Sequence, residues 1–179
     1  MSKLGKKIIS IPKESKVNVQ GNAVTVSGPK GSEKILFNES LFSSKVNEKN
    51  EFSIAPLNKD KSVSEMWGTY RSLINNAIIG VTKGHEKNLE LNGVGFKVAQ
   101  QGDQLKLKLG FSHEAVYKVP KGINIKIEKQ TKINISGTDK ALVSKTSSEI
   151  KSLKPVEPYK GKGIKEKDQY VIRKEGKKK

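Results

Sequence analysis

The stretch Val24-Thr25-Val26-Ser27-Gly28 alternates apolar and polar side chains and ends at a Ser-Gly pair. The same pattern returns in the second half of the chain as Ile133-Asn134-Ile135-Ser136-Gly137. Each copy follows a polar turn and a shorter alternating segment, Val17-Asn18-Val19 in the first half and Ile125-Lys126-Ile127 in the second. Alternation with a period of two is typical of a strand that has one buried face and one face in water. The two copies therefore predict a duplicated domain that contains this pair of short strands.

The first half also contains a segment with the periodicity of an amphipathic helix. Apolar residues recur every three or four positions from Val63 to Ile78, which places them on one helix face. Trp67 and Tyr70 belong to this stripe and are expected in the core. Ser62 and Glu65 have the spacing of a capping box, and Gly80 stands where a C-cap glycine is expected.

A second helix is predicted between Thr138, its expected N-cap, and Pro155, which ends it. Leu142, Ile150 and Leu153 mark its apolar face. Each copy of the strand pair is thus followed by one helix. This order is typical of a small sheet that packs a helix against one of its faces.

Between the two helices, three short segments alternate as strands do. The sequence therefore predicts an α+β protein with two tandem duplicated domains, residues 1–82 and 83–155, each a small antiparallel sheet packed against one helix. Residues 156–179 form a basic C-terminal extension. Because neither strand nor helix patterning continues into it, its removal is expected to leave both domains folded. The alternating segments of the middle are Leu89-Glu90-Leu91, Phe96-Lys97-Val98 and Leu105-Lys106-Leu107-Lys108-Leu109.

The charge of the chain favours an anionic partner, either nucleic acid or an acidic membrane surface. It has 35 Lys and Arg against 18 Asp and Glu, a formal net charge of +17. Arg71 and Arg173 are the only arginines, so most cations lack the planar fork that reads base edges, and contact with a phosphate backbone is expected. The chain has no cysteine, and its two histidines, His85 and His113, lack further ligands at suitable spacing. No disulfide, metal or cofactor is therefore expected.

The segment from Glu157 to Ile164 is the strongest candidate for contact with nucleic acid. Pro158 keeps it extended, and its two glycines let the backbone pass close to a partner. From Lys151 to Lys179 there are eleven Lys and Arg against four Asp and Glu. Tyr159 is expected either to stack on a base or sugar or to pack onto the second domain. The candidate binding residues are Lys154, Tyr159, Lys160, Gly161, Lys162, Gly163, Lys165, Arg173, Lys174 and Lys177.

Three other motifs are interpreted mainly as structural. Gly28-Pro29-Lys30-Gly31 lacks the ending of a nucleotide P-loop and is predicted to be a tight turn, with a phosphate contact from Lys30 left open. Gly93-Val94-Gly95 lacks the rest of a dinucleotide fingerprint and is interpreted as a bulge or a close-packing site in a sheet. The loop Gly110-Phe111-Ser112-His113 is either a surface turn or an RNA contact. Because no nucleophile, base and orienting acid can be assembled, no enzyme is expected.

Taken in order, these motifs resemble the bacterial large-subunit ribosomal protein L-six family, a universal ribosomal protein of the large subunit. The resemblance covers essentially the whole chain, and Pro158-Tyr159-Lys160-Gly161-Lys162-Gly163-Ile164 is its most specific motif. Thr146-Ser147-Ser148 is more polar than the alanine-rich helix usual in that family. Other matching segments are residues 1–12, 24–31, 68–76, 80–84, 93–96, 107–113 and 137–140.

The resemblance implies a structural protein of the cytoplasmic ribosome that binds and stabilises large-subunit ribosomal RNA near its 3′ region. It further implies a position close to the sarcin–ricin loop and the landing site of translation GTPases, beside neighbouring large-subunit proteins. Neither a membrane nor a small-molecule substrate is expected as a partner. From charge alone, a membrane-surface binder and a hydrolase or transferase with a basic substrate pocket stay open. The first lacks a basic amphipathic helix and the second lacks an acid–base constellation.

Overall fold

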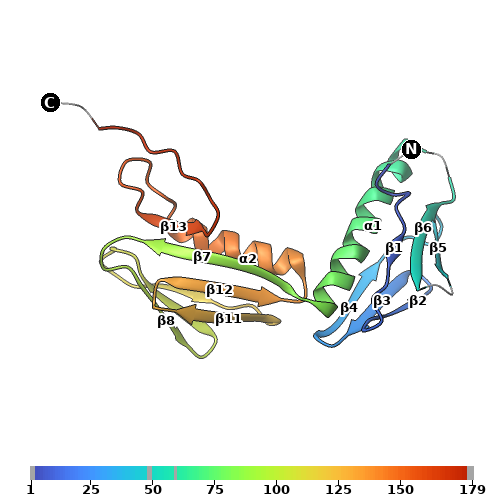
Figure 1. The fold of residues 1–179 in the computed structure, drawn as a ribbon, viewed down its shortest axis with the longest axis horizontal. Helices are drawn as coiled ribbons and strands as arrows, with labels where there is room; N and C mark the ends of the chain where they lie inside the picture. The colour runs from blue at the N-terminus through green and yellow to red at the C-terminus, as the bar shows by residue number, and fades with distance from the viewer. Residues whose placement is uncertain (1–2, 48–49, 59, 177–179) are drawn as a thin grey trace. The chain divides into compact units, whose positions relative to one another are not determined.

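The computed structural model describes residues 3–47, 50–58 and 60–176, which divide into two compact units. We call Met1–His85 with Thr138–Lys140 unit 1, and Glu86–Gly137 with Ala141–Lys179 unit 2. Each unit combines strands with one long helix, as Figure 1 shows. The predicted α+β class is therefore confirmed.

In the described part of unit 1, six strands form two three-stranded antiparallel sheets beside one helix. The elements are β1 (Ile9–Ser10), β2 (Lys16–Gln20), β3 (Ala23–Gly28), β4 (Gly31–Leu36), β5 (Phe42–Asn47), β6 (Glu51–Pro56) and α1 (Lys61–Thr82). The sheet orders are β1-β6-β5 and β2-β3-β4. The predicted strand pair is the β2–β3 hairpin, in which Val17 lies opposite Val26. Gly28 and Gly31 pair across the next turn, so the predicted tight turn is confirmed.

Helix α1 contacts β3, β4 and β6 and buries the apolar stripe seen in the sequence. Ile74 and Val63 are almost fully buried in the core of unit 1, together with Phe52 of β6. The Trp67 indole Nε1 donates a hydrogen bond to the Ile54 carbonyl at 2.6 Å, which satisfies its one polar atom. Tyr70 packs at the edge of this core with its ring in edge-to-face contact with Phe42. The expected core role of both aromatic residues is confirmed.

Both ends of α1 differ from the predicted positions. The N-cap is Asp60, so Ser62 lies inside the helix and the predicted capping box does not form. Gly80 is also inside the helix, which continues to Thr82 and closes at Gly84. The Gly84 N–H donates to the Ile79 carbonyl at 3.1 Å, and its φ of +82° is the left-handed conformation that favours glycine after a helix. Gly84, four residues beyond the predicted Gly80, is therefore the glycine that ends the helix.

The Lys30 ammonium group donates a hydrogen bond to the Lys83 carbonyl at this end of α1. The Lys30 N–H also donates to the Val81 carbonyl at 3.0 Å. A cation at a helix C-terminus is favourable because the unpaired carbonyls there carry partial negative charge. Lys30 thus has a structural role that the sequence motif did not reveal.

The described part of unit 2 contains a four-stranded and a three-stranded antiparallel sheet with helix α2. The elements are β7 (His85–Asn92), β8 (Lys97–Gln101), β9 (Gln104–Lys108), β10 (Ala115–Lys118), β11 (Ile123–Glu128), β12 (Lys132–Gly137), α2 (Lys140–Leu153) and β13 (Gly163–Glu166). The sheet orders are β11-β12-β7-β13 and β10-β9-β8. Ile125 lies opposite Ile135 in the β11–β12 hairpin, which is the second copy of the repeated strand pair.

Helix α2 lies along the four-stranded sheet and buries Val143 and Ile150 against it (Figure 1). The Tyr117 hydroxyl on β10 donates to the Glu149 carboxylate at 2.6 Å and ties the three-stranded sheet to the helix. Burial, followed by this hydrogen bond, raises the pKa of Tyr117 to about 12. Gly93-Val94-Gly95 forms a turn between β7 and β8, so its interpretation as a bulge is wrong. The alternative of a close-packing site holds for Gly93, where a Cβ atom would lie 3.0 Å from the Phe96 ring, although the turn lies outside the strands.

Strand β13 contradicts the expectation that the C-terminal extension carries no sheet structure. It pairs antiparallel with β7, with Ile164 opposite Leu91, and the Ile164 side chain is 0% exposed in the core of unit 2. A four-residue strand with a single large apolar side chain, between glycine and charged residues, shows no alternation. This is why the sequence pattern missed it.

The polar segment Thr146-Ser147-Ser148 of α2 places a hydroxyl group in the core, which should lower the free energy of unfolding. Ser147 is buried, and its hydroxyl has no hydrogen-bond partner among the residues that the structure describes. Ser147→Ala is expected to raise the free energy of unfolding by about 1 kcal/mol, because it removes an unpaired buried hydroxyl and improves helix propensity. Urea denaturation measures this change. Ser148→Ala, at the exposed neighbouring position, is the control. An equal increase in the free energy of unfolding for both variants would show that the buried hydroxyl is not the cause.

Candidate nucleic-acid interface

The predicted binding segment forms a closed loop between α2 and β13, over residues 157–162. The Glu157 N–H donates to the Lys162 carbonyl at 2.8 Å, and the Gly161 N–H donates to the Glu157 carbonyl at 3.0 Å. A further main-chain bond, from Ile164 to the Lys154 carbonyl at 2.9 Å, fixes the start of β13 beside the end of α2. The segment is therefore a closed turn, and the prediction that Pro158 keeps it extended is wrong.

Residues after β13 return to this loop. The Lys167 N–H donates to the Asn88 carbonyl at 3.0 Å, and the Lys174 N–H donates to the Pro158 carbonyl at 2.9 Å. The second bond places Arg173 and Lys174 beside the loop. The structure thus brings together two groups of predicted cations that the sequence separates.

The two glycines of the motif are required by the chain itself. Gly161 has φ +67°, and a Cβ atom there would lie 3.1 Å from the Arg173 guanidinium. Gly163 has φ +140°, and a Cβ atom there would lie 2.6 Å from the Pro155 carbonyl oxygen. Both values of φ lie in the region that favours glycine, and the space beside both residues is already filled. Their direct contact with RNA stays a prediction.

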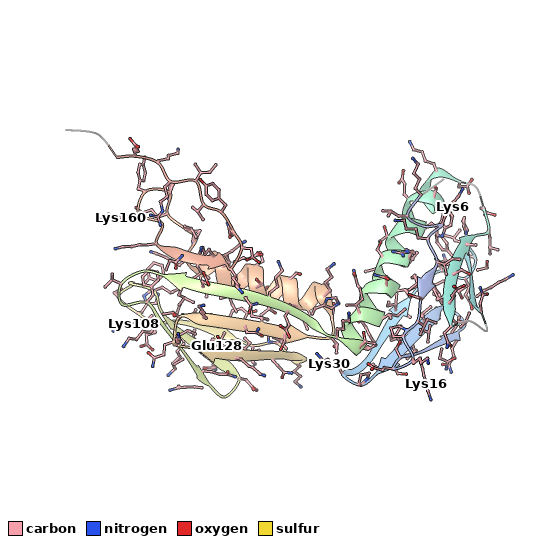
Figure 2. The ribbon with its side chains drawn as sticks, in the orientation of Figure 1. Lys6, Lys16, Lys30, Lys108, Glu128 and Lys160 are labelled. Carbon is pink, nitrogen blue, oxygen red and sulfur yellow. The ribbon has the colours of Figure 1, made fainter. Side chains whose placement is uncertain are left out.

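The predicted cations have different surroundings. Lys160 and Lys162 are exposed on the closed loop, where Figure 2 labels Lys160, and Tyr159 beside them is 55% exposed. Lys165 lies in β13, and its ammonium nitrogen is 3.8 Å from a carboxylate oxygen of Glu90 on β7. This ion pair compensates part of the Lys165 charge. Lys154 follows α2, and its ammonium lies over the Phe111 ring. Lys177 lies outside the described residues.

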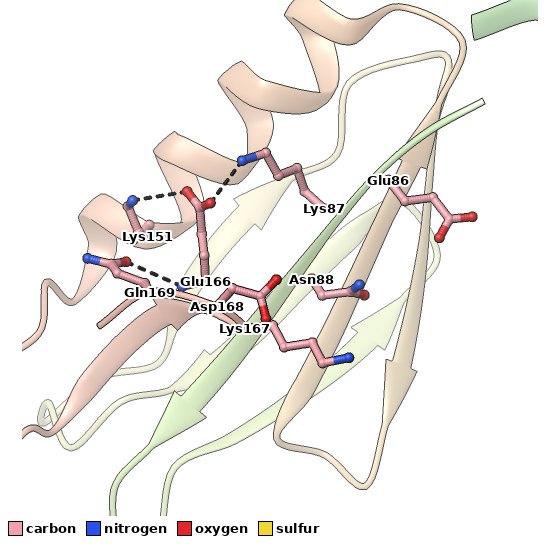
Figure 3. A pocket seen from close by; sticks show the side chains of 8 residues that line it. All are labelled: Glu86, Lys87, Asn88, Lys151, Glu166, Lys167, Asp168 and Gln169. Atoms are coloured by element: carbon pink, nitrogen blue, oxygen red, sulfur yellow. Dashed lines mark hydrogen bonds and ion pairs between the residues drawn. The ribbon is translucent and has the colours of Figure 1, made fainter. Parts of the chain in front are cut away.

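A carboxylate clamp that the sequence did not reveal holds β13 in place. Glu166 accepts hydrogen bonds from Lys87 on β7 at 2.8 Å and from Lys151 on α2 at 3.2 Å, as Figure 3 shows. The Gln169 side-chain oxygen accepts from the Glu166 N–H at 3.4 Å and closes the turn that follows. The two lysines come from β7 and α2, far from Glu166 in the sequence, so no sequence spacing could have indicated them.

The ion pairs of Glu166 should make the stability of unit 2 depend on pH. The hydrogen bond from Lys87, and next that from Lys151, lower the pKa of Glu166 below its ordinary value of 4.5. A carboxylate with a lowered folded-state pKa contributes stability above the unfolded-state pKa, and this contribution is lost as the pH falls through the folded-state value. Glu166→Gln should therefore destabilise the chain at neutral pH and by less in acid.

The measurement is the free energy of unfolding of both proteins from about pH 6 to about pH 3. The difference between wild type and Glu166→Gln is expected to shrink as the pH falls. Glu114→Gln, which changes an exposed carboxylate, is the control and should show a small difference at every pH. A constant gap for Glu166→Gln would contradict the pKa argument.

Comparison with known proteins accounts for the repeat. The model of the family "Ribosomal protein L6" matches residues 11–84 and again residues 92–167. The chain belongs to the ribosomal protein L6 family. "Large ribosomal subunit protein uL6" of Bartonella henselae is 45% identical over 179 residues, which cover 100% of both chains. The proteins of the same name from Methylocella silvestris and Rhizobium meliloti are each 44% identical over the same length.

Membership of the ribosomal protein L6 family settles the functional class. The chain is a structural, non-enzymatic component of the ribosome, and its location is the cytoplasmic ribosome. The two family matches also confirm the tandem duplication predicted from the repeated strand pair. In the part of the chain that the structure describes, no helix is long and apolar enough to cross a membrane. Nor do these residues bring three or more His, Cys, Asp or Glu side chains together as metal ligands.

Proposed function

We propose that this L6-family protein binds and stabilises ribosomal RNA of the large subunit near its 3′ region. The proposed position is close to the sarcin–ricin loop and the landing site of translation GTPases, in contact with neighbouring large-subunit proteins. The name of the relatives, a protein of the large ribosomal subunit, supports the assignment to that subunit. The finer position rests on the resemblance of the basic motif.

The observation that carries the proposal is the cluster of exposed cations on the closed loop. Lys160 and Lys162 project from the loop itself, and main-chain pairing brings Arg173 and Lys174 beside it. Cations held close together neutralise several phosphates at once and release the counterions bound to them, which favours binding. Because the loop is closed by hydrogen bonds, less conformational entropy is lost when RNA binds.

We propose a division of work along the chain. Residues 1–82 and 83–155 act as rigid domains, and residues 156–179 carry the anchoring cations. Strand β13 adds a feature to this scheme, because it builds part of the anchor into the sheet of the second domain. The orientation of the loop is therefore set by the fold of that domain.

The test is binding of the whole chain to a folded RNA of the large-subunit 3′ region that contains the sarcin–ricin loop. Affinity for this RNA is expected to exceed affinity for bulk RNA of the same length across a salt series, and log affinity should fall linearly with log salt. Nucleotides protected from chemical cleavage should lie near the sarcin–ricin loop. Equal affinity for both RNAs, or protection elsewhere, would overturn the proposed position.

A further inference from the structure

A groove of about 510 Å³ opens on unit 2 beside the closed loop of residues 157–162. Three segments form it: the turn after β7, the loop after β9, and the segment that follows α2. Its volume lies within the range of about 300–1,000 Å³ that is usual for ligand sites. The residues that matter for its chemistry are Val94, Phe96, Phe111, Lys154, Glu157 and Lys162.

The groove has an exposed aromatic surface. Phe111 is 44% exposed although it is a large apolar residue, and Val94 beside it is 96% exposed. The His113 ring lies nearly parallel to Phe111, with 16° between the planes and 6.2 Å between the centroids. His113 does not line the groove itself, so the flat surface available to an unpaired base is the Phe111 ring.

The rim of the groove is cationic. The Lys154 ammonium lies over the Phe111 ring, 4.3 Å from its centroid, and Lys162 on the closed loop is exposed at the same groove. A cation over an exposed ring is weakly held, so a phosphate can draw the ammonium away and leave the ring face for a base. Glu157, also at the groove, disfavours a second phosphate and can accept a hydrogen bond from a base amino group.

We propose that this groove receives one unpaired RNA nucleotide, with its base on Phe111 and its phosphate between Lys154 and Lys162. The combination of an exposed ring, an ammonium group over its face and a second lysine at the groove favours a nucleotide over an apolar peptide, for which the lysines would have no counterpart. This inference rests on the proposed function, because it assigns a base-stacking site to the same RNA. The base stacked on Phe111 adds a contact that does not depend on salt to an interface otherwise built on charge.

The first experiment compares Phe111→Leu with the wild-type chain on the folded 3′-region RNA. Leucine keeps the apolar bulk but removes the ring face. Affinity is expected to fall by about 5- to 150-fold, the range found when a stacked aromatic is lost, while the slope against log salt stays unchanged. Lys162→Gln should instead reduce that slope by about one phosphate contact. Unchanged affinity for Phe111→Leu, in a chain with wild-type thermal stability, would overturn the proposal.

The second experiment detects binding at the groove by tryptophan fluorescence. The chain has one tryptophan, Trp67, which is buried in unit 1. Phe111→Trp therefore adds one exposed indole at the groove, and a short single-stranded oligoribonucleotide should quench it while the wild-type emission stays constant. An emission unaffected by the oligoribonucleotide but shifted by isolated large-subunit proteins would overturn the nucleotide assignment in favour of a protein partner.

The two experiments separate this inference from the function on which it rests. Failure of the proposed function would appear as equal affinity of the wild-type chain for folded 3′-region RNA and bulk RNA. Quenching of Phe111→Trp by the oligoribonucleotide would still support the groove in that case. Preferred binding of the folded RNA without any effect of Phe111→Leu would retain the function and refute the groove.

Discussion

Ile164→Ala is expected to lower the free energy of unfolding by about 2–5 kcal/mol, the usual cost of truncating a large side chain in a packed core. Ile164 lies in β13 with its side chain 0% exposed, among the core residues of unit 2 that include Leu89 and Ile150. The truncation leaves a cavity where the C-terminal segment meets the sheet. Urea denaturation followed by far-ultraviolet circular dichroism measures the loss.

The matched control is Ile172→Ala, which truncates the same side chain at a position that is 73% exposed in the same C-terminal segment. Its effect should lie within about 0.5 kcal/mol of zero. Equal effects of the two variants would contradict the assignment of β13 to the core of unit 2.

Deletion of residues 156–179 is expected to destabilise unit 2 for the same reason. It removes the buried Ile164, the pairing of β13 with β7, and the Glu166 carboxylate that joins Lys87 to Lys151. The sequence predicted that this deletion leaves both domains folded, whereas the structure leads us to expect a lower melting temperature of unit 2. For the same reason, a loss of RNA binding by the deletion alone would not locate the binding residues.

The fold was readable from sequence wherever a pattern is local. The alternation at Val24–Gly28 and Ile133–Gly137 predicted β3 and β12, because each strand buries one face along its own length. The stripe from Val63 to Ile78 predicted α1 for the equivalent helical reason. Strand β13 was missed because its stability comes from β7 and α2, which lie far away in the sequence.

The candidate site shows the same division. Composition identified the cations of the tail, but not that main-chain pairing places Lys174 beside Pro158. The motif identified Gly161, whereas the reason for that glycine is the Arg173 side chain packed against it. The position of Lys154 over Phe111 joins two segments whose sequences carry no shared signal. The sequence thus reveals which residue types are present, but it does not reveal which residues lie beside each other in the folded chain.

Replacing the four clustered cations by glutamine should cause the largest loss of RNA binding. The variant combines Lys160→Gln, Lys162→Gln, Arg173→Gln and Lys174→Gln, which are all exposed positions. If each cation neutralises one phosphate, the slope of log affinity against log salt should flatten by about three, and affinity should fall by about a hundredfold to a thousandfold. Filter binding to the folded 3′-region RNA across a salt series measures both quantities.

The control must remove the same charge elsewhere. Lys13, Lys16, Lys34 and Lys45 are exposed on unit 1, and their replacement by glutamine changes the net charge equally. This variant should lose only the weak, general attraction of a positive protein for RNA, which is screened by salt. Equal losses in the two variants would mean that RNA binds through overall charge and that the closed loop is not the anchor.

The variant that lacks the four loop cations should keep its thermal stability, because main-chain hydrogen bonds at Glu157, Gly161 and Lys174 close the loop, and these bonds do not involve the replaced side chains. A flatter salt slope in a chain of unchanged stability would therefore identify the loop cations as phosphate ligands. Any affinity that persists in high salt would then come from contacts without counterion release, and the aromatic groove at Phe111 is the place where the structure offers one.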